Sequence, residues 1–331
     1  MNAVPARVAD FVGHDEIAAP ADIQDVAPAP DLKPTGPSAT AIRLRAFADE
    51  AWPPLVGIGA FLGLWAVCAP LVNTSLGTLP GPLDVVRAFG GLMEEYSAGR
   101  DAAAAAIAAG RTYAGPPTFV DQIFTSLITV AAGFILASLV AVPLGLVAGM
   151  SKRFNAAINP LVQVMRPVSP LAWLPIVTMV ISASMSGGND GWMAKSFVIS
   201  AIVVMLCSLW PTLINTAIGT ASIDKDLLNV SRVLRLGWFA KLRRLVLPSA
   251  LPYIFTGMRL SLGTGWMVLI AAEMLAQNPG LGKFVWDEFQ NGNEQSLARI
   301  MVAVVVIGLI GFALDRIMMA FQNLVSRNRT L

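Results

Sequence analysis

Six apolar segments, separated by polar or charged stretches, fill most of the chain after residue 53. Each is long enough to cross roughly 30 Å of hydrocarbon as a helix, at about 1.5 Å per residue. The segments 122–149 and 196–222 contain no Asp, Glu, Lys or Arg. The pattern therefore predicts an all-α integral membrane fold with six transmembrane helices, at about 54–72, 122–149, 156–182, 196–222, 249–276 and 298–322.

The first 40 residues follow a different pattern. They have no periodic apolar face and are rich in alanine and proline. Such a composition cannot bury a core, so residues 1–40 are expected to be a disordered tail, and they lack the basic and apolar regions of a signal peptide. Residues 41–52 carry apolar side chains at helical spacing, which predicts a short interfacial helix before the first span. We therefore divide the chain into a tail, 1–40, and a membrane domain, 41–331.

Composition narrows the function classes. Of the 331 residues, 55% are of the types AVILMFWYC and only 13% are charged, whereas an average soluble domain carries roughly 25% charged residues. The one histidine, His14, lies in the tail, so metal clusters and histidine-based catalysis have almost nothing to use. Cys68 and Cys207 lie in apolar runs, where we expect small buried hydrophobes. A membrane enzyme is the weakest interpretation, and we assign no catalytic residue and no metal ligand.

The distribution of Lys and Arg indicates the orientation, because these residues gather on the cytoplasmic side of membrane proteins. With the N-terminus inside, twelve of them fall inside: Arg43, Arg45, Lys152, Arg153, Lys225, Arg232, Arg235, Lys241, Arg243, Arg244, Arg327 and Arg329. Five fall outside: Arg87, Arg100, Arg111, Lys195 and Lys283. Both termini are therefore expected to be cytoplasmic. In the long outer loop 73–121, we expect a short helix after Pro82, and a second helix or a spacer at the alanine-rich stretch 101–110.

The inner loop 223–248 departs from a short polar connection. Its apolar residues recur at intervals of three and four, and its arginines take other faces. The Leu236-Gly237 step predicts a break between two short helices. Such a pair is either a docking site for a partner protein or an interfacial anchor that contacts lipid headgroups. Since the chain has no GxxxxGK[ST] phosphate loop, any ATP hydrolysis must come from another chain.

Charged residues interrupt the apolar spans, among them Arg166, Arg259 and Glu273. A charge at bilayer depth costs roughly 2.5–3.5 kcal/mol on insertion scales, so it usually faces protein or water. All three are candidates for lining a translocation pathway, and the two arginines would offset the lost hydration of an anion. The alternative is structural: each arginine pairs with Glu273, a carbonyl or a headgroup, and Glu273 stabilises the outer end of its span.

Prolines within the spans mark further candidates. Ser169 and Trp173 lie among three prolines in 167–175, and Asn215 follows Pro211. Helix breaks at such positions are tolerated in a membrane where protein or water satisfies the freed carbonyls. These side chains therefore either face a cavity or belong to ordinary packing. Small residues four apart in 59–63 and in 145–149 permit close helix approach, within one subunit or between two.

Several strings occur in an order that resembles one family: RPVSPLAWLP (166–175), LWPTLINTA (209–217), PYIFTGMRLSLGTGW (252–266), AAEML (271–275) and GLGKFVWDEFQNG (280–292). From Trp52 to Arg329, the chain resembles the membrane-spanning permease subunits of ABC importers that handle nitrate, bicarbonate, cyanate, taurine and sulfonates, and it is most similar to the nitrate type. The resemblance implies the type I ABC importer permease fold. It does not extend to residues 1–40.

The resemblance also implies a coupling helix within 226–246 that fits a cleft on the ATPase. Leu247-Pro248 matches the end of the family's motif, whereas Asn229-Val230-Ser231 stands where Glu-Ala-Ala is usual and Arg235 stands where glycine is usual. The residues carried over to ATPase coupling are Asn229, Val230, Ser231, Arg232, Val233, Leu234, Arg235, Leu236, Gly237 and Phe239. The outer residues Trp286, Asp287, Glu288 and Phe289 are candidates for contact with a binding protein, or for aromatic anchoring at the interface.

The resemblance also implies a set of partners. They are a second permease copy in a homodimer, two cytoplasmic ABC ATPases that bind ATP and Mg, a periplasmic solute-binding protein and the bacterial inner membrane. No cofactor in this chain and no nucleic acid is implied. The expected function is import of a small anion, most of all nitrate or nitrite, with bicarbonate, cyanate or taurine and alkanesulfonates as alternatives. An ion-coupled secondary transporter is the alternative from another class, but the sequence contains no convincing internal repeat.

Overall fold

The computed structural model describes residues 39–74, 77–112, 115–185 and 194–327, and these are almost entirely helical. Residues 1–38, which make up nearly all of the predicted tail, lie outside the described residues, as does Arg329. The chain divides into two units, 1–59 and 60–331. Within the first, the described residues belong to α1 (Ala39–Cys68).

Helix α1 joins two elements that the sequence pattern had separated. The predicted interfacial helix and the start of the first span form one helix that continues through Pro53 and Pro54. A full break there would leave more backbone groups unpaired than the two prolines already do, which an apolar environment disfavours. Cys68, at the end of α1, is exposed, so the expectation that it is buried is wrong, whereas Cys207 is half-buried. Most apolar side chains near the middle of α1 are exposed, as on a helix that faces lipid.

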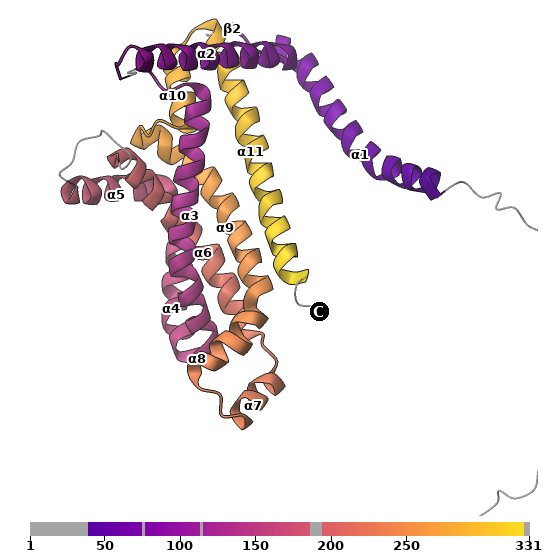
Figure 1. Cartoon of the computed structure of the whole chain (residues 1–331), viewed down its shortest axis with the longest axis vertical. Coiled ribbons are helices and arrows are strands. Elements are labelled where there is room, and N and C mark those ends of the chain that lie inside the picture. Colours follow the sequence, from indigo (N-terminus) through magenta and orange to yellow (C-terminus); the bar gives the residue numbers. More distant parts are fainter. Residues whose placement is uncertain (1–38, 75–76, 113–114, 186–193, 328–331) are drawn as a thin grey trace, which may run out of the picture. The chain divides into compact units, whose positions relative to one another are not determined.

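The second unit continues from the end of α1 into a long surface helix. After a 3₁₀ turn (Ala69–Leu71), β1 (Asn73–Thr74) and β2 (Gly77–Thr78) form a two-residue antiparallel pair. Helix α2 (Pro82–Ala108) then combines the predicted short helix and the alanine-rich stretch into one element. Its first turn is closed by the Asp84 carboxylate, which accepts the Gly81 N–H at 3.0 Å. In Figure 1, α2 runs across the helices α3 and α11 rather than along them.

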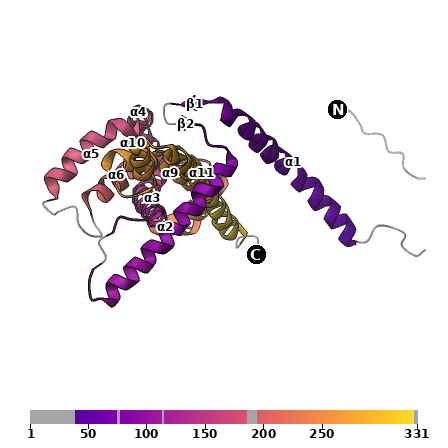
Figure 2. The ribbon, with the colours of Figure 1, turned by 90° about the horizontal axis from the view of Figure 1, so that it is seen from above.

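The remaining helices form the membrane body. They are α3 (Phe119–Met150), α4 (Lys152–Met165), α5 (Pro170–Ser184), α6 (Lys195–Ala221), α7 (Lys225–Val233), α8 (Trp238–Lys241), the π-helical turn η2 (Leu242–Val246), α9 (Leu247–Ala276), α10 (Leu281–Asn291) and α11 (Glu294–Arg327). Figure 2 shows α3, α6 and α9 close to end-on, while α2 and α5 lie in the plane of the view. Helix α6 packs most extensively, against α3 on one side and α9 on the other.

Small residues allow the close contact between α3 and α6. A Cβ atom built on Gly145 would lie 2.6 Å from Cβ of Thr216, and one on Gly149 would lie 2.4 Å from Cβ of Thr220. The predicted close approach at 145–149 therefore occurs, and it occurs within the subunit. On the α9 side, Thr212 of α6 and Ser261 of α9 share a hydrogen bond between their hydroxyl groups, at 2.7 Å.

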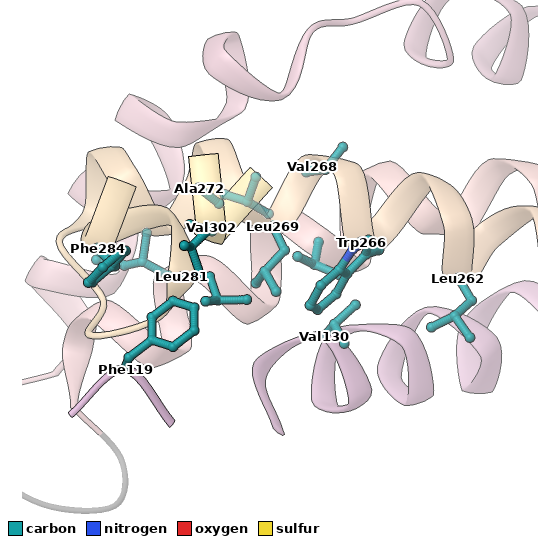
Figure 3. Close-up of a cluster of buried hydrophobic side chains, with 14 of the residues drawn as sticks. Phe119, Val130, Leu262, Trp266, Val268, Leu269, Ala272, Leu281, Phe284 and Val302 are labelled. Carbon is teal, nitrogen blue, oxygen red and sulfur yellow. The ribbon is translucent and has the colours of Figure 1, made fainter. Parts of the chain in front are cut away.

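The main apolar core lies toward the end of the bundle that carries α10. Figure 3 shows Phe119, Val130, Trp266, Leu281 and Phe284 converging there from α3, α9 and α10. The rings of Phe119 and Phe284 are 4.9 Å apart between centroids. This packing anchors α10 to the ends of α3 and α9, so the short helix is part of the body rather than a loose loop.

Five helical stretches among the described residues are long and apolar enough to span a membrane: Trp52–Leu71, Phe119–Met150, Lys195–Ala221, Trp238–Ala276 and Gln295–Val325. The expected helical membrane fold is confirmed. The segment predicted as a single span at 156–182 differs: it is the pair α4 and α5, bent by 101°. The bend occurs where Pro167 and Pro170 remove backbone donors. Ser169, the residue before Pro170, is extended, as is usual before a proline. The pair counts as a sixth crossing or as a re-entrant element.

Candidate functional site

The segment from α7 to α8, residues 225–241, forms the predicted pair of helices. The second of them, α8, is the beginning of a longer helical stretch rather than a separate helix. Helix α8 leads through η2 directly into α9, so that Trp238–Ala276 is one helical stretch of 39 residues. The π-helical turn lies just before Pro248, which has no N–H to donate to the carbonyl of residue 244. Any displacement of α8 therefore passes along a continuous helix into the membrane body.

The turn between α7 and α8 requires unusual geometry at Arg235 rather than at Gly237. Arg235 has φ 47°, in the left-handed region, whereas Gly237 has φ −60° and is extended. The Arg235 N–H donates to the carbonyl of Arg232, and the Leu236 N–H donates to that of Ser231, both at 3.0 Å. These two bonds define a Schellman motif, which usually places glycine at the left-handed position. The expected break at Leu236-Gly237 is present, since α7 ends at Val233 and α8 begins at Trp238. The left-handed residue within it is Arg235, which occupies the position where the resembled permeases usually carry glycine.

The residues of the α7–α8 segment fall into an exposed set and an inward set. Val233 is 82% exposed and Phe239 is 68% exposed, and the other large exposed apolar side chains are Leu227, Val230, Leu234 and Trp238. Ser231 is buried, and its hydroxyl donates to the carbonyl of Leu228 at 2.7 Å. Arg232 donates to the side-chain oxygen of Asn229 at 3.0 Å. Leu227 and Trp238 were not among the residues expected on this face. The three-residue spacing between Leu227 and Val230, which places these two on one face of α7, could have indicated Leu227.

The residues Arg166, Ser169 and Trp173 lie together at the bend between α4 and α5. Arg166 caps the end of α4, and Ser169 caps α5 by accepting the Leu171 N–H at 3.3 Å. Arg166 and Ser169 are exposed, and Trp173 is half-buried. Within the described part of the chain, Arg166 takes part in no ion pair. It therefore presents an uncompensated positive charge at a helix break.

Arg259 is in a different environment, because it forms a two-fold ion pair across α9 and α11. Its Nε lies 2.5 Å from Oδ1 of Asp315, and its Nη2 lies 2.8 Å from Oδ2. Of the partners expected for this arginine, namely Glu273, a carbonyl or a headgroup, Glu273 is therefore wrong. Both side chains of the ion pair are more than a third exposed. A charge within an apolar span is stabilised by an opposite charge, but only the fold could bring these two residues together across 56 positions. The ion pair offsets the positive charge that an anion would otherwise meet.

Glu273 lies at the junction of α9, α3 and α10 and is completely buried. Its carboxylate accepts the Ser126 hydroxyl, at 2.9 and 2.8 Å to its two oxygens, and the Gly282 N–H at 3.0 Å. The Leu281 N–H donates to the Ser126 hydroxyl at 2.9 Å, which closes the network. A Cβ atom on Gly280 would lie 2.2 Å from the carboxylate, so only glycine fits there. These contacts favour the structural role of Glu273.

Asn215 also makes its contacts inside the bundle. Its side-chain amide donates to the carbonyl of Pro211 at 2.8 Å, and its Cβ lies 2.9 Å from where a Cβ on Gly257 would be. It is half-buried at the contact of α6 with α9. The six pathway candidates thus do not converge: three lie at the α4–α5 bend, and the others lie at three separate helix contacts.

The end of the second unit that carries α10 contains a polar network that could not be anticipated from the sequence. Arg299 of α11 lies 3.1 Å from Glu288 of α10 and 2.5 Å from Glu95 of α2. Glu288 is buried and also accepts the Ser296 hydroxyl at 2.9 Å. Of the four residues considered for a binding-protein contact, Phe289 is exposed, whereas Asp287 pairs with Lys283. Within the described ranges, no three His, Cys, Asp or Glu side chains are grouped to hold a metal ion.

Comparison with known proteins adds sequence relatives to this geometry. Residues 141–330 match the family described as the binding-protein-dependent transport system inner membrane component. A nitrate import permease of Synechococcus elongatus is 33% identical over 276 residues, which cover 83% of this chain and 89% of the relative. A bicarbonate transport system permease of the same species is 33% identical over 286 residues, with the same coverage. A solved structure of the MetNI methionine ABC transporter covers 61% of this chain and 95% of its own, with 17% identity and a TM-score of 0.49.

Proposed function

The chain belongs to the family of inner membrane components of binding-protein-dependent transport systems, which are ABC transporter permeases, and we propose that it imports a small planar anion, with nitrate or nitrite as the substrate. Relatives named as nitrate permeases support this proposal. Relatives named as bicarbonate permeases are equally similar, so bicarbonate is the second candidate. Nitrate and bicarbonate are both flat monoanions with three oxygens, so one pathway suits either ion.

The observation that carries the proposal is the exposed apolar face of the α7–α8 segment. Val233, Leu234 and Phe239 are exposed on a segment that also carries basic side chains. We assign this face to contact with a separate cytoplasmic ATPase, because the sequence contains no phosphate loop of its own. The distribution of Lys and Arg supports the cytoplasmic placement of the segment.

The continuous helix from α8 to α9 suggests how ATP binding drives the pathway. Closure of two ATPases would displace α8, and the displacement would pass through η2 into α9 and on to α6, which packs along it. Rigid helices that move as a body can switch a pathway from one side of the membrane to the other. In this proposal two permease copies flank the pathway, a solute-binding protein delivers the anion outside, and this chain performs no catalysis.

We place Arg166, Ser169 and Trp173 on the pathway, since the α4–α5 bend carries the uncompensated charge of Arg166. Replacing Arg166→Gln should lower the rate of anion uptake by roughly tenfold, because a fixed positive charge offsets the lost hydration of the ion. Arg153→Gln, which removes an exposed charge from the same helix α4, is the matched control and should leave uptake nearly unchanged. Equal uptake by both variants would remove Arg166 from the pathway.

The substrate proposal is tested by uptake in a deletion strain that carries the complete transporter. Isotopically labelled nitrate and bicarbonate are supplied in separate assays, and each serves as a competitor of the other. Restored uptake of nitrate that excess bicarbonate does not suppress supports the proposal. Restored uptake of bicarbonate alone would replace it with the second candidate, and uptake of neither ion would reject both.

A further inference from the structure

An open cavity of about 550 Å³ lies between the α7–α8 segment and the ends of α3, α4 and α6. Four parts of the second unit line it: the junction of α3 and α4, the end of α6, helix α7, and the stretch from α8 into η2. Its polar lining consists of Lys152, Asn155, Thr220, Asn229, Arg232 and Lys241. None of the described residues that line it is acidic.

The charges of this cavity are unbalanced. Lys152 comes from α4, Arg232 from α7 and Lys241 from α8, so three cations from three segments face the same space. Within the described residues, none of the three forms an ion pair, and Arg232 has only the neutral oxygen of Asn229 as a partner. Like charges that converge in this way repel one another, and a bound anion relieves the repulsion.

The uncharged part of the lining also suits an oxygen-rich ligand. Thr220 also lines the cavity, but its hydroxyl oxygen is closed off from the surface, so the polar groups that a ligand can reach are those of the other lining residues. Asn155 and Asn229 add amide groups, and Lys152 is the first residue of the 14-residue helix α4. The N-terminus of a helix favours negative charge.

We propose that this cavity binds a phosphate-type oxyanion, supplied either as a free ion or as the headgroup of an anionic lipid. The occupant bridges Lys152 of α4 to Arg232 and Lys241, and so ties the α7–α8 segment to the membrane body. Occupancy therefore restrains the segment that carries the exposed apolar face. The inference goes beyond the proposed function and requires neither nitrate transport nor an ATPase.

The binding is measured on the full chain alone, in lipid nanodiscs, by hydrogen–deuterium exchange of the backbone amides. In discs of phosphatidylcholine, millimolar inorganic phosphate should slow exchange across residues 225–241 by roughly fivefold, relative to chloride at equal ionic strength. A second arm replaces part of the lipid with phosphatidylglycerol and omits phosphate. Slowing in the first arm identifies a free oxyanion as the ligand, and slowing in the second identifies a lipid headgroup.

Three variants test whether this cavity is responsible. Lys152→Gln combined with Lys241→Gln should abolish the slowing, while Arg243→Gln combined with Arg244→Gln should keep it, because these two arginines do not line the cavity. Arg232→Gln removes the third cation of the lining, and should weaken phosphate binding by several-fold even if the lysine variant does not fold. No slowing in either arm, or equal slowing in wild type and in the lysine variant, would overturn the proposal. Loss of nitrate uptake in a separate assay would leave this result unaffected.

Discussion

The Glu273 carboxylate is fully enclosed between three helices, and each of its hydrogen bonds joins two of them. It binds Ser126 on α3 and the backbone of Gly282 on α10, while it belongs to α9 itself. The carboxylate accepts the N–H of Gly282, which lies in the first turn of α10 and has no acceptor within that helix. These contacts favour a structural role for Glu273 over a place on the pathway.

Replacing Glu273→Ala should lower the free energy of unfolding by about 3 kcal/mol, because it leaves the buried Ser126 hydroxyl and the Gly282 N–H without their acceptor. Thermal unfolding of the detergent-solubilised chain measures the change. Glu94→Ala, which removes an exposed carboxylate from α2, should have little effect. Equal stability of the two variants would show that the network contributes nothing.

At Arg235, in contrast to Glu273, the backbone conformation matters more to the structure than the side chain. Its left-handed conformation costs a residue with a side chain roughly 1–2 kcal/mol, and glycine avoids this cost. Arg235→Gly should therefore slow local amide exchange in residues 231–237 by about fivefold. Arg243→Gly places glycine in helical backbone and should speed local exchange instead. Faster exchange in Arg235→Gly would contradict the observed turn.

At the level of elements, the contact of α3 with α6 sets how closely the bundle packs. The glycines of α3 leave room for Thr216 and Thr220, and any side chain there would overlap backbone or Cβ atoms of α6. Such overlap cannot be relieved by rotating a flexible side chain, because the neighbours belong to a rigid helix. The half of the bundle near the junction of α3 with α4 thus depends on glycine at Gly145 and Gly149 of α3.

Replacing Gly145→Val should prevent folding or reduce the yield of folded protein severely, since its Cβ would lie 2.6 Å from that of Thr216. Gly308→Val is the matched control in α11, where a Cβ atom meets nothing within 4 Å. The yield of monodisperse protein after size-exclusion chromatography compares the two. A normal yield of Gly145→Val would show that α3 and α6 are not packed as described.

Over the whole molecule, the sequence predicts the elements better than their contacts. Apolar runs identify the spans because hydrocarbon thickness fixes their length, and Pro167 and Pro170 contain the signal for the α4–α5 bend. The pairing of Arg259 with Asp315 could not be predicted from the sequence alone, because it depends on how α9 faces α11. The same holds for Ser126 and Glu273, which are 147 positions apart. For the coupling residues, helical spacing indicated the exposed face, but not which residue of the turn takes the left-handed conformation.

The central claim is that this chain moves an anion with energy received from another protein through the α7–α8 segment. Proteoliposomes that contain the chain, its ATPase and a solute-binding protein loaded with labelled nitrate test this claim most directly. Wild type should take up nitrate only when ATP is present on the ATPase side, and Leu234→Asp combined with Phe239→Asp should abolish uptake while the chain remains folded. Uptake without ATP, or undiminished uptake by the double variant, would contradict the account.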